Sequence, residues 1–162
     1  MSAARKLLVF GGISLAVCGM LYGLHYAIFI EHQTLDRLGG SLATAFVHGA
    51  ERKLPDAHVA LAAYGATKYD YARQVDVHSH WIGLAMLMIV MGVVFDSVGF
   101  GDRTRYLIAL ALLVGSVIFP LGVILQTETH GGAFASVLAV VGSGLVIASL
   151  AAIAIGFARQ TN

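Results

Sequence analysis

The sequence has little charge, few prolines and a single cysteine. Of its 162 residues only 12% are charged and 58% are apolar, whereas a soluble domain is nearer one quarter charged and half apolar. The mean hydropathy of +0.82 agrees with this imbalance. The composition therefore predicts an integral membrane protein, and the length predicts one domain over residues 1–162.

Several function classes are excluded by what is missing. The lone Cys18 excludes an internal disulfide and a CxxC motif, and no CxxCH is present for covalent haem attachment. There is no HExxH motif of the kind found in zinc hydrolases. A formal net charge of +1, without a basic run, gives no indication of nucleic-acid binding.

Four apolar runs are long enough to cross a bilayer, since about 20 helical residues span roughly 30 Å of hydrocarbon. The runs are continuous and rich in Leu, Ala and Met, which excludes the alternating pattern of membrane strands. The first run is too long for a cleaved signal and lacks an A-x-A site. We expect an all-α membrane protein, an antiparallel bundle of four transmembrane helices at about 7–30, 77–98, 106–126 and 133–158.

The basic residues near the span ends predict the orientation. One side of the predicted bundle is basic, with few acids nearby, and this side is expected to be cytoplasmic. It carries Arg5, Lys6, Arg103, Arg105 and Arg159. Both termini then lie inside the plasma (inner) membrane, and segment 31–76 faces the periplasm or cell exterior.

Segment 31–76 is too long for a bare connector. Leu38-Gly39-Gly40 and Leu54-Pro55-Asp56 divide it, and apolar residues recur at helical spacing within 41–52 and 56–73. We expect two short interfacial helices that cap the bundle from outside, the second of them either separate or continuous with the next span.

Small residues occur every three or four positions along the first span, at Gly12, Ala16, Gly19 and Gly23. Such a row lets another helix approach closely. Similar Gly-rich and Ala-rich faces in the fourth span would also permit a homo-oligomer.

The histidines are concentrated in one part of the chain. Six of the seven lie between His25 and His80, and the seventh, His130, follows the third span, so the predicted topology places all seven at the outer face. Imidazole is a costly group at the edge of hydrocarbon, which makes such histidines candidate site residues. His25 and His80 lie about 9 Å and 6 Å inside the predicted span ends. His48 and His58 are expected to be solvated or capping, and the role of His32 stays open.

The motif Asp76-Val77-His78-Ser79-His80 opens the second span and is the main candidate site. Two positions apart on a helix, His78 and His80 point about 200° apart and cannot share one ion. A b-type haem suits this pattern, because it needs one or two neutral imidazoles, small residues beside them and cations for its propionates. The candidate residues are His25 and His80 as leading axial pair, His78 in reserve, Gly23 and Gly83 for clearance, and Lys68 and Arg73 for the propionates.

The His78-Ser79-His80 tripeptide at the start of a membrane helix resembles the H-x-H of the haem-copper oxidase catalytic subunit, where the two histidines ligate different haems. The plan as a whole is similar to small four-helix membrane b-type cytochromes. This sequence has no adjacent His-His pair for copper and no histidine inside its third and fourth spans. The resemblance therefore implies at most one haem.

Three functions are compatible with this pattern of histidines. The first is a membrane haem oxidoreductase that carries out one-electron chemistry at the outer face, with quinol as candidate donor and oxygen or a reactive oxygen species as candidate acceptor. The second is a haem-free Zn or Cu site whose ligands come from among Asp76, His78, His80, Glu128 and His130. The third is a cofactor-free assembly or regulatory subunit whose histidines respond to external pH.

Overall fold

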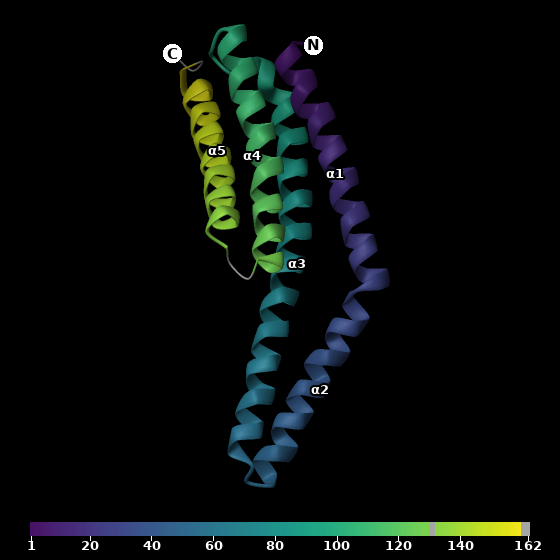
Figure 1. Ribbon diagram of the computed structural model, residues 1–162. Helices are drawn as coiled ribbons and strands as arrows, with labels where there is room; N and C mark the ends of the chain where they lie inside the picture. Colours follow the sequence, from purple (N-terminus) through teal and green to yellow (C-terminus); the bar gives the residue numbers. More distant parts are fainter. Residues whose placement is uncertain (130–131, 160–162) are drawn as a thin grey trace. The chain divides into compact units, whose positions relative to one another are not determined.

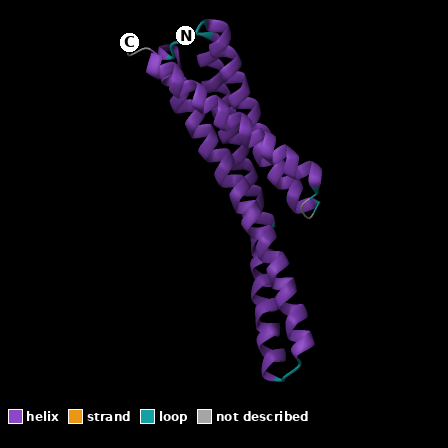
Figure 2. Cartoon of the chain, turned by 90° about the vertical axis from the view of Figure 1, so that its left-hand side faces the viewer, coloured by secondary structure: helices purple, strands orange, loops and turns teal. Residues whose placement is uncertain are grey.

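The computed structural model describes residues 1–129 and 132–159. Within these residues the chain is helical, with no strand (Figure 2). The elements follow one another as α1 (Ala3–Phe29), α2 (Glu31–Ala50), α3 (Leu54–Val94), a 3₁₀ turn η1 (Phe95–Ser97), α4 (Asp102–Glu128) and α5 (Ala133–Ala158).

Four helices are long and apolar enough to cross a membrane, namely α1, α3 together with η1, α4 and α5. The predicted all-α fold with four such segments is therefore confirmed. Their ends lie within a few residues of the predicted ones, except that α3 begins well before residue 77. The long apolar runs predict these helices well because only a helix satisfies every backbone polar group inside hydrocarbon.

The predicted boundaries of the first short helix are wrong. Helix α2 begins at Glu31 and runs through Gly39 and Gly40, where a break was expected. Glycine in a helix interior costs only about 1 kcal/mol relative to alanine, so two glycines do not end a helix that is otherwise favoured. For the second helix, the alternative of continuity with the next span is confirmed, because α3 runs from Leu54 to Val94. Pro55 is tolerated because it occupies the first turn, where no intrahelical N–H is needed.

The described chain divides into two compact units. The first comprises Met1–Met20 and the chain from Val77 onward, and the second comprises Leu21–Asp76. The first unit contains the fully buried apolar side chains Leu8, Val77, Met88, Phe95 and Leu112, which form its core. The outer cap and the single domain over 1–162 stay predictions.

Helix α1 packs closely on α3 within the first unit. A Cβ added at Gly12 would lie 2.9 Å from the Ala85 carbonyl oxygen, and one at Gly19 would lie 3.0 Å from the Cβ of Trp81. The distance at Gly12 is shorter than real Cβ contacts, and the one at Gly19 is tighter than most of them, so the small residues on α1 let the two helices approach. The pairing of early α1 residues with late α3 residues makes these helices antiparallel.

Helices α4 and α5 lie side by side in Figure 1 and approach even more closely. A Cβ at Gly142 of α5 would lie 2.5 Å from the Phe119 nitrogen, and a Cβ at Gly122 of α4 would lie 2.5 Å from the Ala139 nitrogen. In its most apolar stretch α4 is 39% buried, against 22–28% for the other three helices. Helix α4 is therefore the central helix of the first unit.

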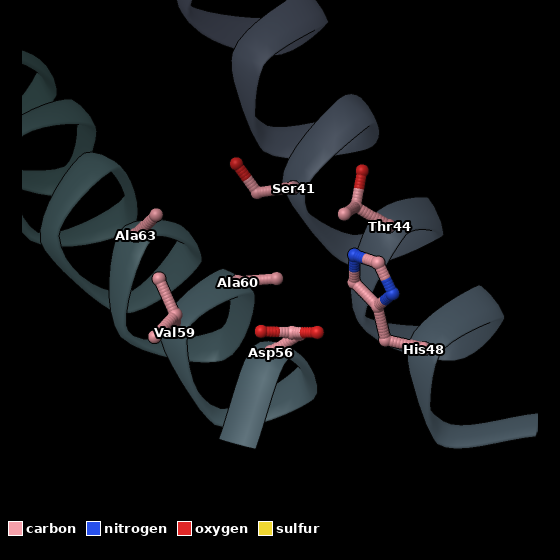
Figure 3. Close-up of a pocket in the computed structure, with 7 residues that line it drawn as sticks. All are labelled: Ser41, Thr44, His48, Asp56, Val59, Ala60 and Ala63. Carbon is pink, nitrogen blue, oxygen red and sulfur yellow. The ribbon is translucent and has the colours of Figure 1, made fainter. Parts of the chain in front are cut away.

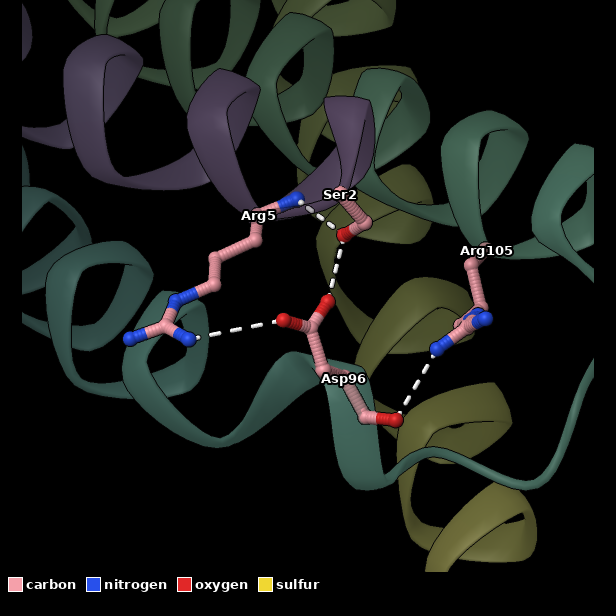
Figure 4. A network of polar contacts seen from close by, with 4 residues as sticks. All are labelled: Ser2, Arg5, Asp96 and Arg105. Carbon is pink, nitrogen blue, oxygen red and sulfur yellow. Dashed lines mark hydrogen bonds and ion pairs between the residues drawn. The ribbon is translucent and has the colours of Figure 1, made fainter.

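A polar network joins the start of α1 to the end of α3 and the start of α4 (Figure 4). The Ser2 hydroxyl donates to the Asp96 carboxylate, and Arg5 Nη1 lies 3.4 Å from the same carboxylate. Arg105 Nη1 donates to the Asp96 carbonyl oxygen at 2.9 Å and its Nη2 pairs with Asp102. These contacts gather three helix ends on the predicted cytoplasmic side.

Candidate functional site

The side chains of the two histidines in the H-x-H motif point from α3 toward different helices. His78 is half-buried, and its Nδ1 lies 2.9 Å from the carbonyl oxygen of Gly19 on α1. The His80 ring instead lies 4.8 Å from the Phe119 ring of α4, centroid to centroid and nearly perpendicular to it. The two imidazoles thus cannot bind one ion together, as their spacing of two residues predicts.

The contact of His78 with Gly19 determines which of its ring nitrogens carries the proton. A carbonyl oxygen only accepts hydrogen bonds, so the Nδ1 at 2.9 Å must be the donor. In the neutral ring the lone pair then resides on Nε2, the form in which imidazole binds a metal. Metal-binding histidines generally have their second nitrogen held in this way. Because Gly19 has no Cβ, α1 lies close to α3 at this point, and the His78 ring can reach the Gly19 carbonyl oxygen.

His80 lies at the edge of an apolar hollow on α3. The hollow has a volume of about 260 Å³ and is lined by Ser79, His80, Gly83, Leu84 and Leu87. A Cβ at Gly83 would meet no atom within 4 Å, so this side of the helix is open. A flat apolar group can therefore approach the imidazole along α3 without a clash from position 83.

His25 and Gly23 belong to the second unit, near the end of α1. The His25 side chain is exposed and its ring lies 5.2 Å from that of Phe29. Because His80 is in the first unit, the pairing of His25 with His80 stays a prediction. His32 and His58 are exposed, and His130 lies outside the described residues.

The two cations expected to face propionates lie over tyrosine rings. The Lys68 Nζ is 5.9 Å from the Tyr64 ring centroid, and the Arg73 guanidinium carbon is 5.1 Å from that of Tyr69. Each pair lies on α3 at a spacing of four residues, which brings both side chains to one face of the helix. The propionate role of Lys68 and Arg73 stays a prediction.

A group of tyrosine contacts within the second unit was not foreseen from the sequence. The Tyr22 hydroxyl donates to Gln74 Oε1, and the Tyr71 hydroxyl lies 3.4 Å from Glu31 Oε1. The Tyr26 and Tyr71 rings lie 6.5 Å apart, centroid to centroid. These contacts hold the end of α1, the start of α2 and the middle of α3 together. The partners of these tyrosines depend on how the helices are rotated about their axes, which hydropathy does not determine.

A second hollow lies between α2 and α3 in the same unit (Figure 3). Its volume is about 440 Å³, within the usual range of small-molecule sites. Polar side chains from α2 and the Asp56 carboxylate from α3 line it, together with Val59, Ala60 and Ala63; those from α2 are Ser41, Thr44 and His48. His48 Nδ1 also lies 3.9 Å from Glu51 Oε2. His48, expected to be solvated or capping, thus belongs to a concave polar surface that the sequence pattern did not reveal.

A bare metal ion and a haem iron need different numbers of protein ligands. Across residues 1–129 and 132–159, no three His, Cys, Asp or Glu side chains gather into a group that could hold a metal ion. A haem-free Zn or Cu site needs three or four such ligands. A haem iron needs only one or two protein ligands, because the porphyrin supplies the other four. His80 beside its apolar hollow supplies the one ligand that a haem iron requires from the protein; the haem-free site stays a prediction, because His130 lies outside the described residues.

Comparison of the chain with protein-family models, with curated proteins and with solved structures returns no match. The geometry of the residues described above is accordingly the basis for the function proposed below.

Proposed function

We propose that this chain is a multi-pass membrane haem protein that carries out one-electron redox chemistry near the outer membrane face. The observation that carries the proposal is the divergence of the H-x-H motif, with His78 held by the Gly19 carbonyl and His80 beside an open apolar hollow. A single bound b-type haem would supply a reversible one-electron couple.

His80 is the proposed protein ligand to the iron. Its ring lies against the Phe119 edge, which limits how it can rotate, and Gly83 one turn away leaves room for the macrocycle. The Leu84 and Leu87 side chains line the hollow and would give a bound haem an apolar wall. Lys68 and Arg73 remain the proposed partners of the propionates, and His25 the proposed second axial ligand.

His78 has a different proposed role. Its hydrogen bond to Gly19 fixes the rotation of α3 relative to α1 near the motif, so that the His80 side is turned toward α4. His78 is thereby a positioning residue. If His78 bound the iron instead, it would do so through Nε2. The haem content of the variants His80→Ala and His78→Ala distinguishes the two cases.

The proposed physiological electron donor is a quinol, because it diffuses within the bilayer and reaches a site at the membrane edge. The proposed acceptor is oxygen, a reactive oxygen species or another redox protein. The proposed topology has both termini in the cytoplasm, from the basic residues at one side of the spans.

Haem content in point variants tests the ligand assignment. The protein is purified in mild detergent after expression with a haem precursor, and haem per chain is measured by pyridine haemochrome. His80→Ala is expected to abolish haem binding and His25→Ala to abolish or alter it, whereas His48→Ala is the matched control and should retain wild-type content. Equal loss in all three variants would contradict the assignment, and loss in His78→Ala alone would transfer the ligand role to His78.

A further inference from the structure

An open groove between α4 and α5 has no role in the proposed haem site. Its volume is about 250 Å³, slightly below the range of pockets for drug-sized ligands. Leu107, Ile108 and Ala111 line it from α4, and Leu145, Ala148 and Ala152 from α5. The groove is open and lined almost entirely by apolar side chains of two neighbouring helices, which suits a hydrocarbon chain lying along them.

The groove between α4 and α5 has two polar side chains in its lining and two arginines near one end. Thr104 lines it near the start of α4, and Ser149 of α5, only 4% exposed, lines it further along. Arg103 precedes Thr104 and lies four residues from Leu107, hence on the same face of α4 one turn further out. On α5, Arg159 lies seven residues from Ala152 and likewise shares its face. Both arginines are exposed, so the groove has a basic end.

The positive charge at this end is not matched by nearby carboxylates. Asp96 is paired with Arg5 (Figure 4), and Asp102 is paired with Arg105. The Arg159 guanidinium lies 5.1 Å from the centroid of the Phe100 ring, a contact that leaves its charge in place. Arg103, Arg159 and the exposed Lys6 therefore give this end an excess of cations over anions.

We infer that the α4–α5 groove binds an anionic phospholipid of the leaflet at the basic end. One acyl chain lies along Leu107, Ala111 and Leu145, and the headgroup phosphate contacts Arg103 and Arg159. Basic residues beside a groove between transmembrane helices are the chemistry that recognises anionic headgroups. This inference depends on the membrane-spanning helices but not on haem, so each can fail without the other.

Native mass spectrometry of the detergent-purified protein tests the inference, with phosphatidylglycerol and phosphatidylcholine of identical acyl chains as probes. The wild type is expected to bind phosphatidylglycerol preferentially. The double variant Arg103→Gln/Arg159→Gln should weaken phosphatidylglycerol binding by about tenfold or more, since each basic residue near the headgroup contributes to affinity. Arg37→Gln/Arg52→Gln removes the same charge from two exposed positions of the other unit and should bind as the wild type does.

A groove-filling variant tests the acyl-chain contact separately. Ala148→Phe places a ring in the groove and should reduce binding of both lipids, whereas Ala154→Phe, at an exposed position of α5 outside the groove, should not. Equal binding of the two lipids by the wild type would overturn the inference. So would equal losses in the arginine and control variants, or a dimer that Ala148→Phe disrupts, which would make this face an interface between copies of the chain.

Discussion

The imidazole Nδ1 of His78 donates a hydrogen bond to the carbonyl oxygen of Gly19 at 2.9 Å, which links α3 to α1. Because His78 is half-buried between two membrane-length helices, this bond stabilises their contact: without it the polar groups would lose a partner. It also directs His78 away from His80, whose ring contacts that of Phe119 on α4.

Loss of this hydrogen bond should destabilise the helical bundle. His78→Ala is expected to lower the free energy of unfolding by about 0.5–2 kcal/mol, the usual range for hydrogen bonds between membrane helices. Unfolding in mixed micelles of mild detergent and SDS, followed by far-UV circular dichroism, measures the change. His58→Ala, at an exposed position of the same helix, should have the stability of the wild type. Equal stability of both variants would show that the His78 contact contributes nothing.

The α4–α5 contact should depend on Gly142 and not on Gly144, which lies two residues further along α5. Gly142→Ala places a methyl group 2.5 Å from the Phe119 nitrogen and should destabilise the protein by about 1–3 kcal/mol, as overpacking does. Gly144→Ala meets no atom within 4 Å and should be neutral or stabilising by up to about 1 kcal/mol. The same unfolding assay compares them. A Gly144 variant as unstable as the Gly142 variant would mean that backbone freedom, not close packing, explains the glycines.

The sequence predicted the four membrane-length helices because each apolar run is continuous and long. It did not predict the start of α2, because Gly39-Gly40 resembles a break although helix continues through it. The contact of His78 with Gly19 was also unpredictable, since hydropathy does not determine the rotation of one helix about its axis against another. The divergence of His78 and His80, in contrast, follows directly from their spacing.

The close approach of helices was partly foreseeable. The small residues along α1 predicted a near neighbour, and Gly12 and Gly19 do lie against α3. The sequence did not say which helix that neighbour would be. It also gave no indication that Ser41, His48 and Asp56, on two different helices, line one hollow, because residues that share a concave surface need not share a sequence pattern.

The predicted orientation can be tested with single cysteines. In a Cys18→Ser background, Lys68→Cys should react with a membrane-impermeant maleimide added to spheroplasts, whereas Arg103→Cys should react only after the membrane is permeabilised. The reason is that basic residues near span ends are retained in the cytoplasm. The opposite labelling pattern would place the H-x-H motif at the inner face and reverse the proposed topology.

The visible absorption spectrum of the wild-type protein, purified in mild detergent and recorded before and after dithionite, is the most direct measurement of the central claim. We expect a Soret band that shifts on reduction, with about one b-type haem per chain. A colourless protein would contradict the account: stoichiometric zinc or copper would then point to a bare metal site, and the absence of any metal to a subunit without a cofactor.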